Sequence, residues 1–394
     1  MKLRIALFSW ESLHSLAVGG LAVHVTELAA ALERLGNEVH VFTRIGPNQG
    51  IYSLIDGVHY HRVSFAFDSD LIRELTVNMA RSMVERFNEI ENVFGSFDII
   101  HGHDWHIVTA IDEIKRTKNK KVVFTLHSTQ YGRDGNNFFD GKAKHIRDLE
   151  WFGTYIADRV IVCSQTMKEE IMNIYQVPEY KIRVIPNGIW ARNFDGEIDP
   201  YHDVKKYFGF GVYDPVITFL GRMTHQKGVD ILLESIPLVL QEFPNTRFIF
   251  IGDGYLRPQL ERRAYEMGLL GKNVFFTGYI SDEWKTKIIK ASDCVVVPSR
   301  NEPFGIVVLE AWSCKKPVIA TCGTGAGELI WNGINGYRVQ LNPESIAYGI
   351  KEIIKNPMHA KYMGENGRKI AETIFNWDNI AKQTLRVYEE LLNK

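Results

Sequence analysis

Short apolar runs rich in β-branched and aromatic residues alternate along the chain with longer segments of helical periodicity. Several of these runs, such as VITFL at residues 216–220, are apolar throughout and do not alternate with polar positions. Such runs are typical of parallel strands covered by helices on both faces. The strands predicted in this way are Leu3–Ser9, Glu38–Thr43, Asp98–His101, Val122–His127, Val160–Ser164, Ile182–Pro186, Val216–Gly221, Arg247–Gly252, Asn273–Thr277, Cys294–Pro298, Val318–Thr321 and Tyr337–Val339.

The strands fall into two halves, each of which repeats strand, loop and helix. We therefore predict an α/β fold with two doubly wound (Rossmann-like) domains that face each other across a cleft. A polar segment rich in Gly and Pro places the boundary near residues 190–212. The predicted domains are 1–200 and 205–374, and an amphipathic helix within 375–394 is expected to complete the first.

Composition narrows the class of protein. The chain has 394 residues, 45% of them hydrophobic, and a net charge of −1, which gives no support for binding nucleic acid. The four cysteines form no C-x-x-C pair, so we expect free thiols in a reducing compartment. No run approaches the ~18 apolar residues of a transmembrane helix, and the apolar start is too short for a signal peptide. These features predict a cytoplasmic protein, and they leave peripheral membrane contact open.

Candidate binding chemistry follows the strands of the second half. GRMTHQKG (221–228) comes directly after a strand and carries Arg222 and Lys227, which together suit a diphosphate. By itself this loop is better explained as a solvated surface loop with two ordinary cations, because basic residues are common in loops. Gly252 in IGDGY, one strand later, lets a ligand approach the main chain, or simply makes a turn.

The stretch NEPFGIVVLEAW (301–312) places two carboxylates, Glu302 and Glu310, in an apolar run. We expect a helix to begin at Gly305 or Ile306, where its free N–H groups form an anion site. One carboxylate is then placed for a ribose and the other for a sugar. The alternative is an ordinary helix N-terminus that favours acidic residues. This alternative explains Glu302 better than Glu310, whose neighbours are apolar.

The first half has three further candidates. VGGLAVHV (18–25) brings Gly19 and Gly20 to a strand-to-helix loop, with the helix starting near Leu21. HGHDWH (101–106) suggests either a metal centre or a polar site around Asp104, and VVFTLHS places His127 at the end of the next strand.

A metal-dependent hydrolase would use His101, His103 and His106. The spacing of these residues departs from the H-x-H-x-D-H pattern of such enzymes, because Asp104 directly follows the second histidine. We therefore treat the metal reading as the weaker hypothesis. Trp105 is expected either to stack on a sugar or, preferably, to pack in the core.

GRMTHQKG, IGDG and E-P-F-G-I-V-V-L-E in this order resemble retaining glycosyltransferases of the GT-B fold, family 4, with their glycogen and starch synthase relatives. The resemblance implies transfer of a hexose, most simply glucose, from a nucleotide sugar such as ADP-glucose or UDP-glucose to a hydroxyl acceptor. It implies no separate cofactor. A different sugar donor, or a small-molecule or lipid acceptor, remains an alternative, because Ala17 stands where glycogen synthases using ADP-glucose usually carry a lysine.

The resemblance also assigns roles to residues. His127 contacts the transferred sugar, Asp104 lines the acceptor side, and PNGI (186–189) forms a hinge loop. The catalytic set is His127, Asp104, Glu302, Arg222 and Lys227. The donor-binding set is Gly19, Gly20, Arg222, Lys227, Gly252, Tyr279, Ile280, Phe304, Gly305, Ile306 and Glu310.

We expect the leaving diphosphate to be stabilised by cations and by a helix N-terminus, without a metal. The one D-x-D pair, Asp68–Asp70, lies in a polar segment far from the other motifs. Retention of the anomeric configuration allows a double displacement or a front-face attack. No carboxylate here is a compelling nucleophile, so front-face transfer is the hypothesis. Five basic residues from Lys115 to Lys121 fit a lipid-facing patch or, more simply, a solvated helix end.

Overall fold

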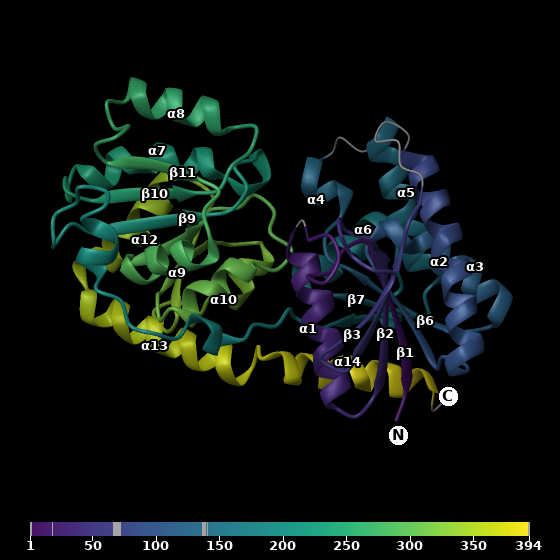
Figure 1. The fold of residues 1–394 in the computed structure, drawn as a ribbon. Coiled ribbons are helices and arrows are strands. Elements are labelled where there is room, and N and C mark those ends of the chain that lie inside the picture. The colour runs from purple at the N-terminus through teal and green to yellow at the C-terminus, as the bar shows by residue number, and fades with distance from the viewer. Residues whose placement is uncertain (1, 18, 66–71, 136–138, 140, 393–394) are drawn as a thin grey trace. The chain divides into compact units, whose positions relative to one another are not determined.

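The structure is a computed structural model that describes residues 2–17, 19–65, 72–135, 139 and 141–392. The chain divides into two compact units (Figure 1). Unit 1 comprises residues 1–188 and 377–394, and unit 2 comprises residues 189–376. The first boundary thus falls before residue 200, where the sequence pattern placed the end of the first domain. The D-x-D pair Asp68–Asp70 lies outside the described residues.

Unit 1 contains an eight-stranded sheet with the order β3-β4-β2-β1-β5-β6-β7-β8. All neighbouring strands run parallel except β3, which is antiparallel to β4. The strands are β1 (Arg4–Ser9), β2 (Glu38–Arg44), β3 (Tyr52–Ile55), β4 (Val58–Val63), β5 (Ile99–His103), β6 (Lys121–Leu126), β7 (Arg159–Val162) and β8 (Ile182–Val184).

Helices cover this sheet, and its core contains stacked aromatic rings. The helices are α1 (Gly20–Arg34), α2 (Ile72–Phe94), η1 (Trp105–Ile107), α3 (Val108–Lys118), α4 (Gln130–Asp134), α5 (Gly141–Ile156), α6 (Gln165–Tyr175), η2 (Glu179–Lys181) and α14 (Trp377–Leu392). Phe8 of β1 stacks on Phe42 of β2 at 4.8 Å between ring centroids, and both are fully buried. Strands with apolar residues on both faces need this two-sided cover.

The C-terminal helix α14 packs on α1 within unit 1. The hydroxyl of Tyr388 is hydrogen-bonded to His101 Nδ1 at 2.6 Å, and Glu390 pairs with Arg159 and Arg183. Because these contacts join the end of the chain to β5, β7 and β8, α14 is part of the core of unit 1.

Unit 2 contains a six-stranded, fully parallel sheet with the order β11-β10-β9-β12-β13-β14. Its strands are β9 (Val216–Leu220), β10 (Arg247–Ile251), β11 (Val274–Gly278), β12 (Cys294–Val297), β13 (Val318–Thr321) and β14 (Gly336–Val339). Its helices are η3 (Ala191–Phe194), η4 (Tyr201–Lys205), η5 (His225–Lys227), α7 (Val229–Leu240), α8 (Arg257–Glu266), α9 (Asp282–Ala291), α10 (Ile306–Ser313), α11 (Gly325–Leu329), α12 (Pro343–Lys355) and α13 (Pro357–Thr373).

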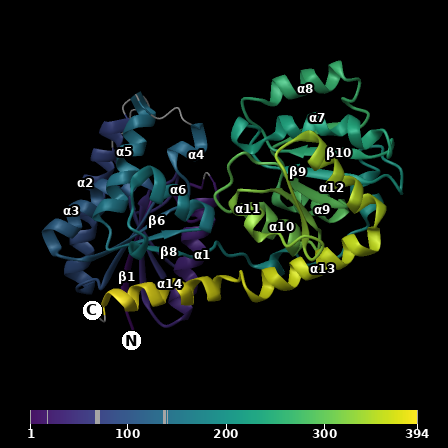
Figure 2. The ribbon, with the colours of Figure 1, turned by 180° about the vertical axis from the view of Figure 1, so that it is seen from behind.

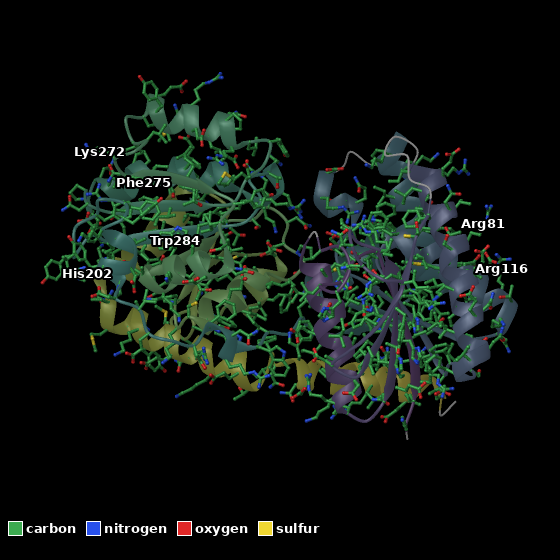
Figure 3. The ribbon with its side chains drawn as sticks, viewed as in Figure 1. Arg81, Arg116, His202, Lys272, Phe275 and Trp284 are labelled. Carbon is green, nitrogen blue, oxygen red and sulfur yellow. The ribbon has the colours of Figure 1, made fainter. Side chains whose placement is uncertain are left out.

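Each face of this second sheet carries its own apolar cluster. One cluster joins β9 and β10 to α7 and α12, and Figure 2 shows these helices from behind. The other includes Phe275 of β11 and Trp284 of α9, which are labelled in Figure 3. Ser281 caps α9 by accepting a hydrogen bond from the Trp284 backbone, which fixes where this helix begins.

The twelve predicted strands all correspond to strands of the structure. The prediction missed β3 and β4. β3 is an edge strand with half of its residues exposed, so its hydrophobic pattern is weak. The signal for the hairpin was the Asp56-Gly57 pair, whose φ angles of 50° and 75° are those of a type I′ turn.

Candidate functional site

The loops that follow β9 and β12 bring Glu302 and Lys227 together in unit 2. Lys227 Nζ donates to Glu302 Oε2 at 2.6 Å, with 18% and 12% of the two side chains exposed. Ser299 Oγ also lies 3.4 Å from Glu302 Oε2. The two predicted residues therefore form a largely buried ion pair at the carboxyl edge of the sheet.

Helix α10 begins at Ile306, where the sequence predicted it. Gly305 caps it with φ at 95°, and a Cβ at this position would lie 2.8 Å from Ala326 Cβ. Both the backbone conformation and the lack of space for a Cβ atom therefore require glycine at position 305. Phe304 is buried against Phe375, so its side chain is part of the core. Only the backbone of Phe304 remains available to a ligand.

Glu310 lies in the second turn of α10, opposite Lys285 of α9. Lys285 Nζ donates to Glu310 Oε1 at 2.9 Å and pairs with Asp282 at 2.8 Å. Burial would lower the pKa of Lys285, but the charges of Glu310 and Asp282 outweigh it, and the pKa is raised. Lys285 was not among the site residues predicted from the sequence. The feature of the sequence that could have pointed to Lys285 as a site residue is its position shortly after FFTGYI.

A pocket of about 280 Å³ lies beside this pair, at the carboxyl ends of β9, β10 and β11. It brings together the predicted residues Arg222, Gly252, Tyr279 and Ile280 with Lys285. Tyr279 is 80% exposed, and Gly252 has φ at 120°, a backbone conformation that favours glycine. The pocket therefore combines an apolar ring with cations, as a nucleotide requires.

A larger hollow of about 640 Å³ lies between α7 and α8, lined by His225 and the Glu234–Arg263 ion pair. None of the predicted site residues lines it. We assign the site to the smaller pocket, because ligands of doubly wound folds bind at the carboxyl ends of strands.

In unit 1, Gly19 and Gly20 stand at the start of α1. The Gly19 backbone is extended, with φ at −157°, so the turn itself does not require glycine there. The Gly19 N–H donates to Glu11 Oε2 at 3.2 Å, and Glu11 is buried. Gly19 and Gly20 are both exposed.

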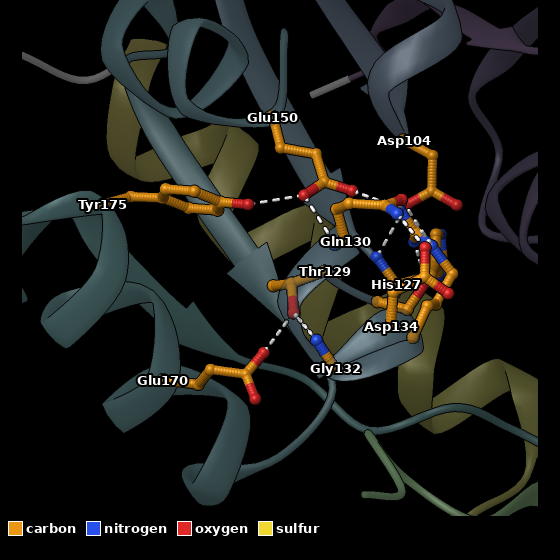
Figure 4. A network of polar contacts seen from close by, with 11 residues as sticks. Asp104, His127, Thr129, Gln130, Gly132, Asp134, Glu150, Glu170 and Tyr175 are labelled. Carbon is orange, nitrogen blue, oxygen red and sulfur yellow. Dashed lines mark hydrogen bonds and ion pairs between the residues drawn. The ribbon is translucent and has the colours of Figure 1, made fainter. Parts of the chain in front are cut away.

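Asp104 follows β5 in a backbone conformation that is rare for a residue with a side chain. Its φ and ψ are 59° and 173°. Its Oδ1 accepts a hydrogen bond from the His127 backbone N–H at 2.8 Å (Figure 4). Burial raises the pKa of Asp104 to about 6. Asp104 therefore ties the end of β5 to the end of β6, where His127 lies.

His127 belongs to a cluster of three imidazoles. His103 Nδ1 is 3.2 Å from His127 Nε2, and the ring of His24 meets that of His127 edge-on at 4.4 Å. His24 Nδ1 in turn is 2.8 Å from Asn187 Oδ1 of the PNGI loop. Burial lowers the pKa of His127 to about 3 and those of His24 and His103 well below their usual range. All three are neutral at pH 7.

The metal centre of the weaker hypothesis, with His101, His103 and His106 as its ligands, is not assembled. Both ring nitrogens of His101 are engaged, by Tyr388 and by Thr125. His106 stacks between Trp105 and Trp10. Side chains at alternate positions of a strand share a face, but they need not converge on one point. Trp105 itself is buried, as preferred.

A second network fixes the loop after His127, and the sequence analysis missed it. Glu150 of α5 is fully buried. It accepts hydrogen bonds from the Gln130 N–H at 2.8 Å and from the hydroxyl of Tyr175 (Figure 4). It also accepts a hydrogen bond from Arg133 Nη2 at 2.6 Å. Thr129 caps α4 and also contacts Glu170 of α6. The loop that carries His127 is thus bonded to two helices.

The basic residues near Lys115 have acidic partners. Lys115 pairs with Asp158, and Lys118 and Lys120 pair with Glu91. Arg116 pairs with Asp112 one turn earlier in α3. This pairing favours the solvated helix end over a lipid-facing patch. Among the helices of the described residues, none combines the length and hydropathy needed to cross a bilayer.

Comparison with known proteins matches both units. The family described as Glycosyltransferase Family 4 matches residues 18–190, and the family described as Glycosyl transferases group 1 matches residues 204–370. The chain is 35% identical to an uncharacterized glycosyltransferase of Methanocaldococcus jannaschii, covering 98% of each protein. It is 25% identical to a glycogen synthase of Mycobacterium tuberculosis, covering 98% of this chain and 94% of that protein. Its fold is similar to that of sucrose-phosphate synthase from Thermosynechococcus elongatus, with a TM-score of 0.80, 24% identity and full coverage of both chains.

Proposed function

The chain belongs to family 4 of the GT-B glycosyltransferases, and from this premise we propose that it transfers glucose from a nucleoside-diphosphate sugar to a hydroxyl acceptor. We further propose that transfer retains the anomeric configuration and needs no metal ion. The observation that carries the proposal is the pocket of unit 2, where Arg222, Tyr279 and Lys285 meet at the carboxyl edge of the sheet.

The donor is proposed to lie along that edge. Tyr279 and Ile280 border the base, and Glu310, held by Lys285, accepts hydrogen bonds from the ribose hydroxyls. The diphosphate meets the N-terminus of α10 together with Arg222 and Lys227. The glycogen synthase relative supports glucose as the transferred sugar.

Three groups near the diphosphate stabilise the charge that develops as it leaves. Lys227 is already held by Glu302 at 2.6 Å, so its ammonium group is positioned before the donor binds. In a front-face transfer the departing diphosphate oxygen takes the proton of the acceptor hydroxyl. Glu302 is bonded to Lys227, which supports an orienting role over that of a nucleophile. Asp104 and His127 are proposed to meet the acceptor and the sugar.

The test is thermal unfolding with ADP, UDP or GDP, each with and without a chelator. A ligand at ~100 times its dissociation constant adds about 2.7 kcal/mol of stability, which raises the unfolding temperature by several degrees. We expect one diphosphate to raise it equally with and without chelator. The same shift should be absent in Arg222→Ala. If no nucleotide raises the unfolding temperature, the proposed donor site is wrong.

Retention is tested separately. The anomeric signal of the first product formed with an α-linked donor, followed by proton NMR, should be α. A β product would contradict retention. A covalent sugar on Glu302, trapped with a slow donor and absent in Glu302→Gln, would contradict front-face transfer.

A further inference from the structure

We propose that His24, His103 and His127 form a binding site for Zn²⁺ in unit 1, and that the bound ion stops sugar transfer. The first part rests on the geometry of the three imidazoles alone. The second part rests on the proposed function, because it needs His127 to meet the transferred sugar.

The three rings come from three different segments and converge on one point. His24 lies in α1, His103 ends β5 and His127 follows β6. One nitrogen of each ring lies within 4.8 Å of the others. On a tetrahedral zinc ion with bonds of about 2.05 Å, two ligand nitrogens are roughly 3.4 Å apart. The 3.2 Å between His103 Nδ1 and His127 Nε2 is already close to this separation. Only a small movement of His24 is needed to complete the set.

Asn187 orients the ring of His24 as the outer shell of a metal site does. Metal-bound histidines usually donate their second N–H to a carbonyl or carboxylate oxygen. Asn187 Oδ1 lies 2.8 Å from His24 Nδ1, so this nitrogen carries the proton and Nε2 presents a lone pair. His103 Nε2 is buried and has no hydrogen-bond partner within the described part of the chain. Because the 3.2 Å contact turns His103 Nδ1 toward the ion, this Nε2 lies on the outer side of the ring and lacks a partner of the kind that Asn187 gives His24.

The chemistry of the donors selects the ion. Metal ions bind the deprotonated nitrogen of an imidazole ring. Imidazole suits Zn²⁺, Ni²⁺ and Cu²⁺, whereas Mg²⁺ and Ca²⁺ prefer oxygen ligands. Three histidines leave a fourth position for water.

The binding test uses Co²⁺ as a spectroscopic substitute for Zn²⁺ on protein that has been treated with a chelator. We expect one equivalent to give the visible absorption bands of a four-coordinate ion, and one equivalent of Zn²⁺ to abolish them. His24→Gln should lose these bands. Asn187→Ala should weaken binding by about 10- to 100-fold, as loss of an outer-shell partner does.

The matched control is His359→Gln, which removes an exposed histidine of unit 2 and should leave the spectrum unchanged. Circular dichroism without metal establishes that each variant is folded. If the wild-type protein gives no visible bands, or if folded His24→Gln gives the same bands, the metal site is wrong.

Inhibition is then measured as the rate with Zn²⁺ divided by the metal-free rate of the same protein. We expect at least a tenfold loss for the wild-type protein and for His359→Gln, and no loss for His24→Gln at the same Zn²⁺ concentration. Stoichiometric binding without inhibition would overturn the second part of the proposal. A protein that transfers no sugar would overturn the proposed function, while the Co²⁺ spectra would still decide the metal site.

Discussion

Asp104 is the residue whose conformation is most difficult to explain by folding alone. Its φ of 59° with ψ of 173° lies in a region that is almost restricted to glycine and costs on the order of 1–3 kcal/mol. Two hydrogen bonds hold it there: its N–H donates to the Thr125 carbonyl at 2.9 Å, and its Oδ1 accepts from the His127 N–H at 2.8 Å. Strain that is maintained in this way beside a buried imidazole is typical of a functional residue.

The first prediction concerns the charge of Asp104. Its pKa of about 6 lies above the ordinary value, so the ionised form appears only as the pH rises through 6. If the carboxylate meets the acceptor, the transfer rate should rise with pH along a limb with an apparent pKa near 6. Asp104→Asn keeps an oxygen for the His127 N–H but cannot ionise, so this limb should vanish. Transfer rates of the wild-type protein and of Asp104→Asn, measured between pH 5 and 8, test this prediction.

Asp148→Asn is the matched control, because Asp148 is exposed on α5. The profile of this variant should retain the limb. Stability adds an independent check on Asp104. A carboxyl whose folded pKa is raised stabilises the fold below its unfolded pKa, and this contribution is lost as the pH rises through about 6. Asp104→Asn should therefore gain stability relative to the wild-type protein above pH 6. If the pH–rate profile of Asp104→Asn kept the limb near pH 6, the proposed contact between the Asp104 carboxylate and the acceptor would be contradicted.

The second prediction concerns Glu310. A hydrogen bond to a charged group contributes about 1.5–3 kcal/mol, and 1.4 kcal/mol is a tenfold change in affinity. Glu310→Gln should therefore weaken binding of the nucleoside diphosphate by tenfold or more, as measured by calorimetry. Glu283→Gln is the control, since Glu283 forms an exposed pair with Lys287 on α9. Equal affinities in the two variants would exclude a contact between Glu310 and the ribose.

At the scale of elements, α4, α5 and α6 fix the loop after β6 through one buried carboxylate. Glu150 is fully buried and pairs with Arg133 at 2.6 Å. Breaking a buried pair leaves an uncompensated charge. No function was predicted for these three helices from the sequence.

The third prediction is that Glu150→Gln destabilises unit 1 by about 3 kcal/mol, because Arg133 loses its only acidic partner recorded in the described residues. For a unit of this size the unfolding temperature should fall by roughly 6–12 °C. The transfer rate should fall as well, since the Gln130 N–H bond positions the loop of His127. Glu169→Gln, on the exposed face of α6, should change neither quantity. A stable Glu150→Gln protein with impaired transfer would mean that the network serves catalysis only.

Elements were easier to predict than the contacts between them. The strand pattern located β12 and the start of α10, because an uninterrupted apolar run followed by Pro and Gly allows few alternatives. The same reasoning missed β3, since an exposed edge strand has no apolar face to mark it.

Glu150 and Lys285 were missed for another reason. From the sequence alone, a charged residue in a helix is expected to be exposed to solvent. Only tertiary packing shows that Glu150 is buried and that Lys285 pairs with Glu310. His24 likewise meets Asn187, which is 163 positions away in the chain.

Across the whole molecule, buried histidines are unevenly distributed. The five that are buried, His24, His40, His61, His101 and His103, all belong to unit 1. The histidines of unit 2, His202, His225 and His359, are exposed. Burial lowers the pKa of His40 to about 4 and that of His61 to about 2, and it lowers the other three well below their usual range.

This distribution predicts that acid unfolds unit 1 before unit 2. A histidine whose folded pKa is lowered contributes stability that is present above its unfolded pKa of about 6.5 and is lost as the pH falls. Each such group costs about 1.4 kcal/mol per pH unit below 6.5 until its folded pKa is reached. Burial also lowers the pKa values of His106 and His127. The raised pKa values of Asp104 and Glu150 act in the opposite direction, but they are two groups against at least seven.

This prediction is tested by amide hydrogen exchange in the presence of a chelator. Exchange rates are compared at pH 7.5 and pH 5 after correction for the pH dependence of intrinsic exchange. Amides of β2 and β5 should lose protection at pH 5 while those of β9 and β12 keep it. His61→Gln removes one proton-binding site, so its free energy of unfolding should fall less steeply with acid, by about 1.4 kcal/mol per pH unit. His359→Gln should follow the wild-type slope, because its imidazole is exposed in both states. Earlier loss of protection in β9 than in β2 would mean that packing, and not imidazole protonation, sets the acid limit of the protein.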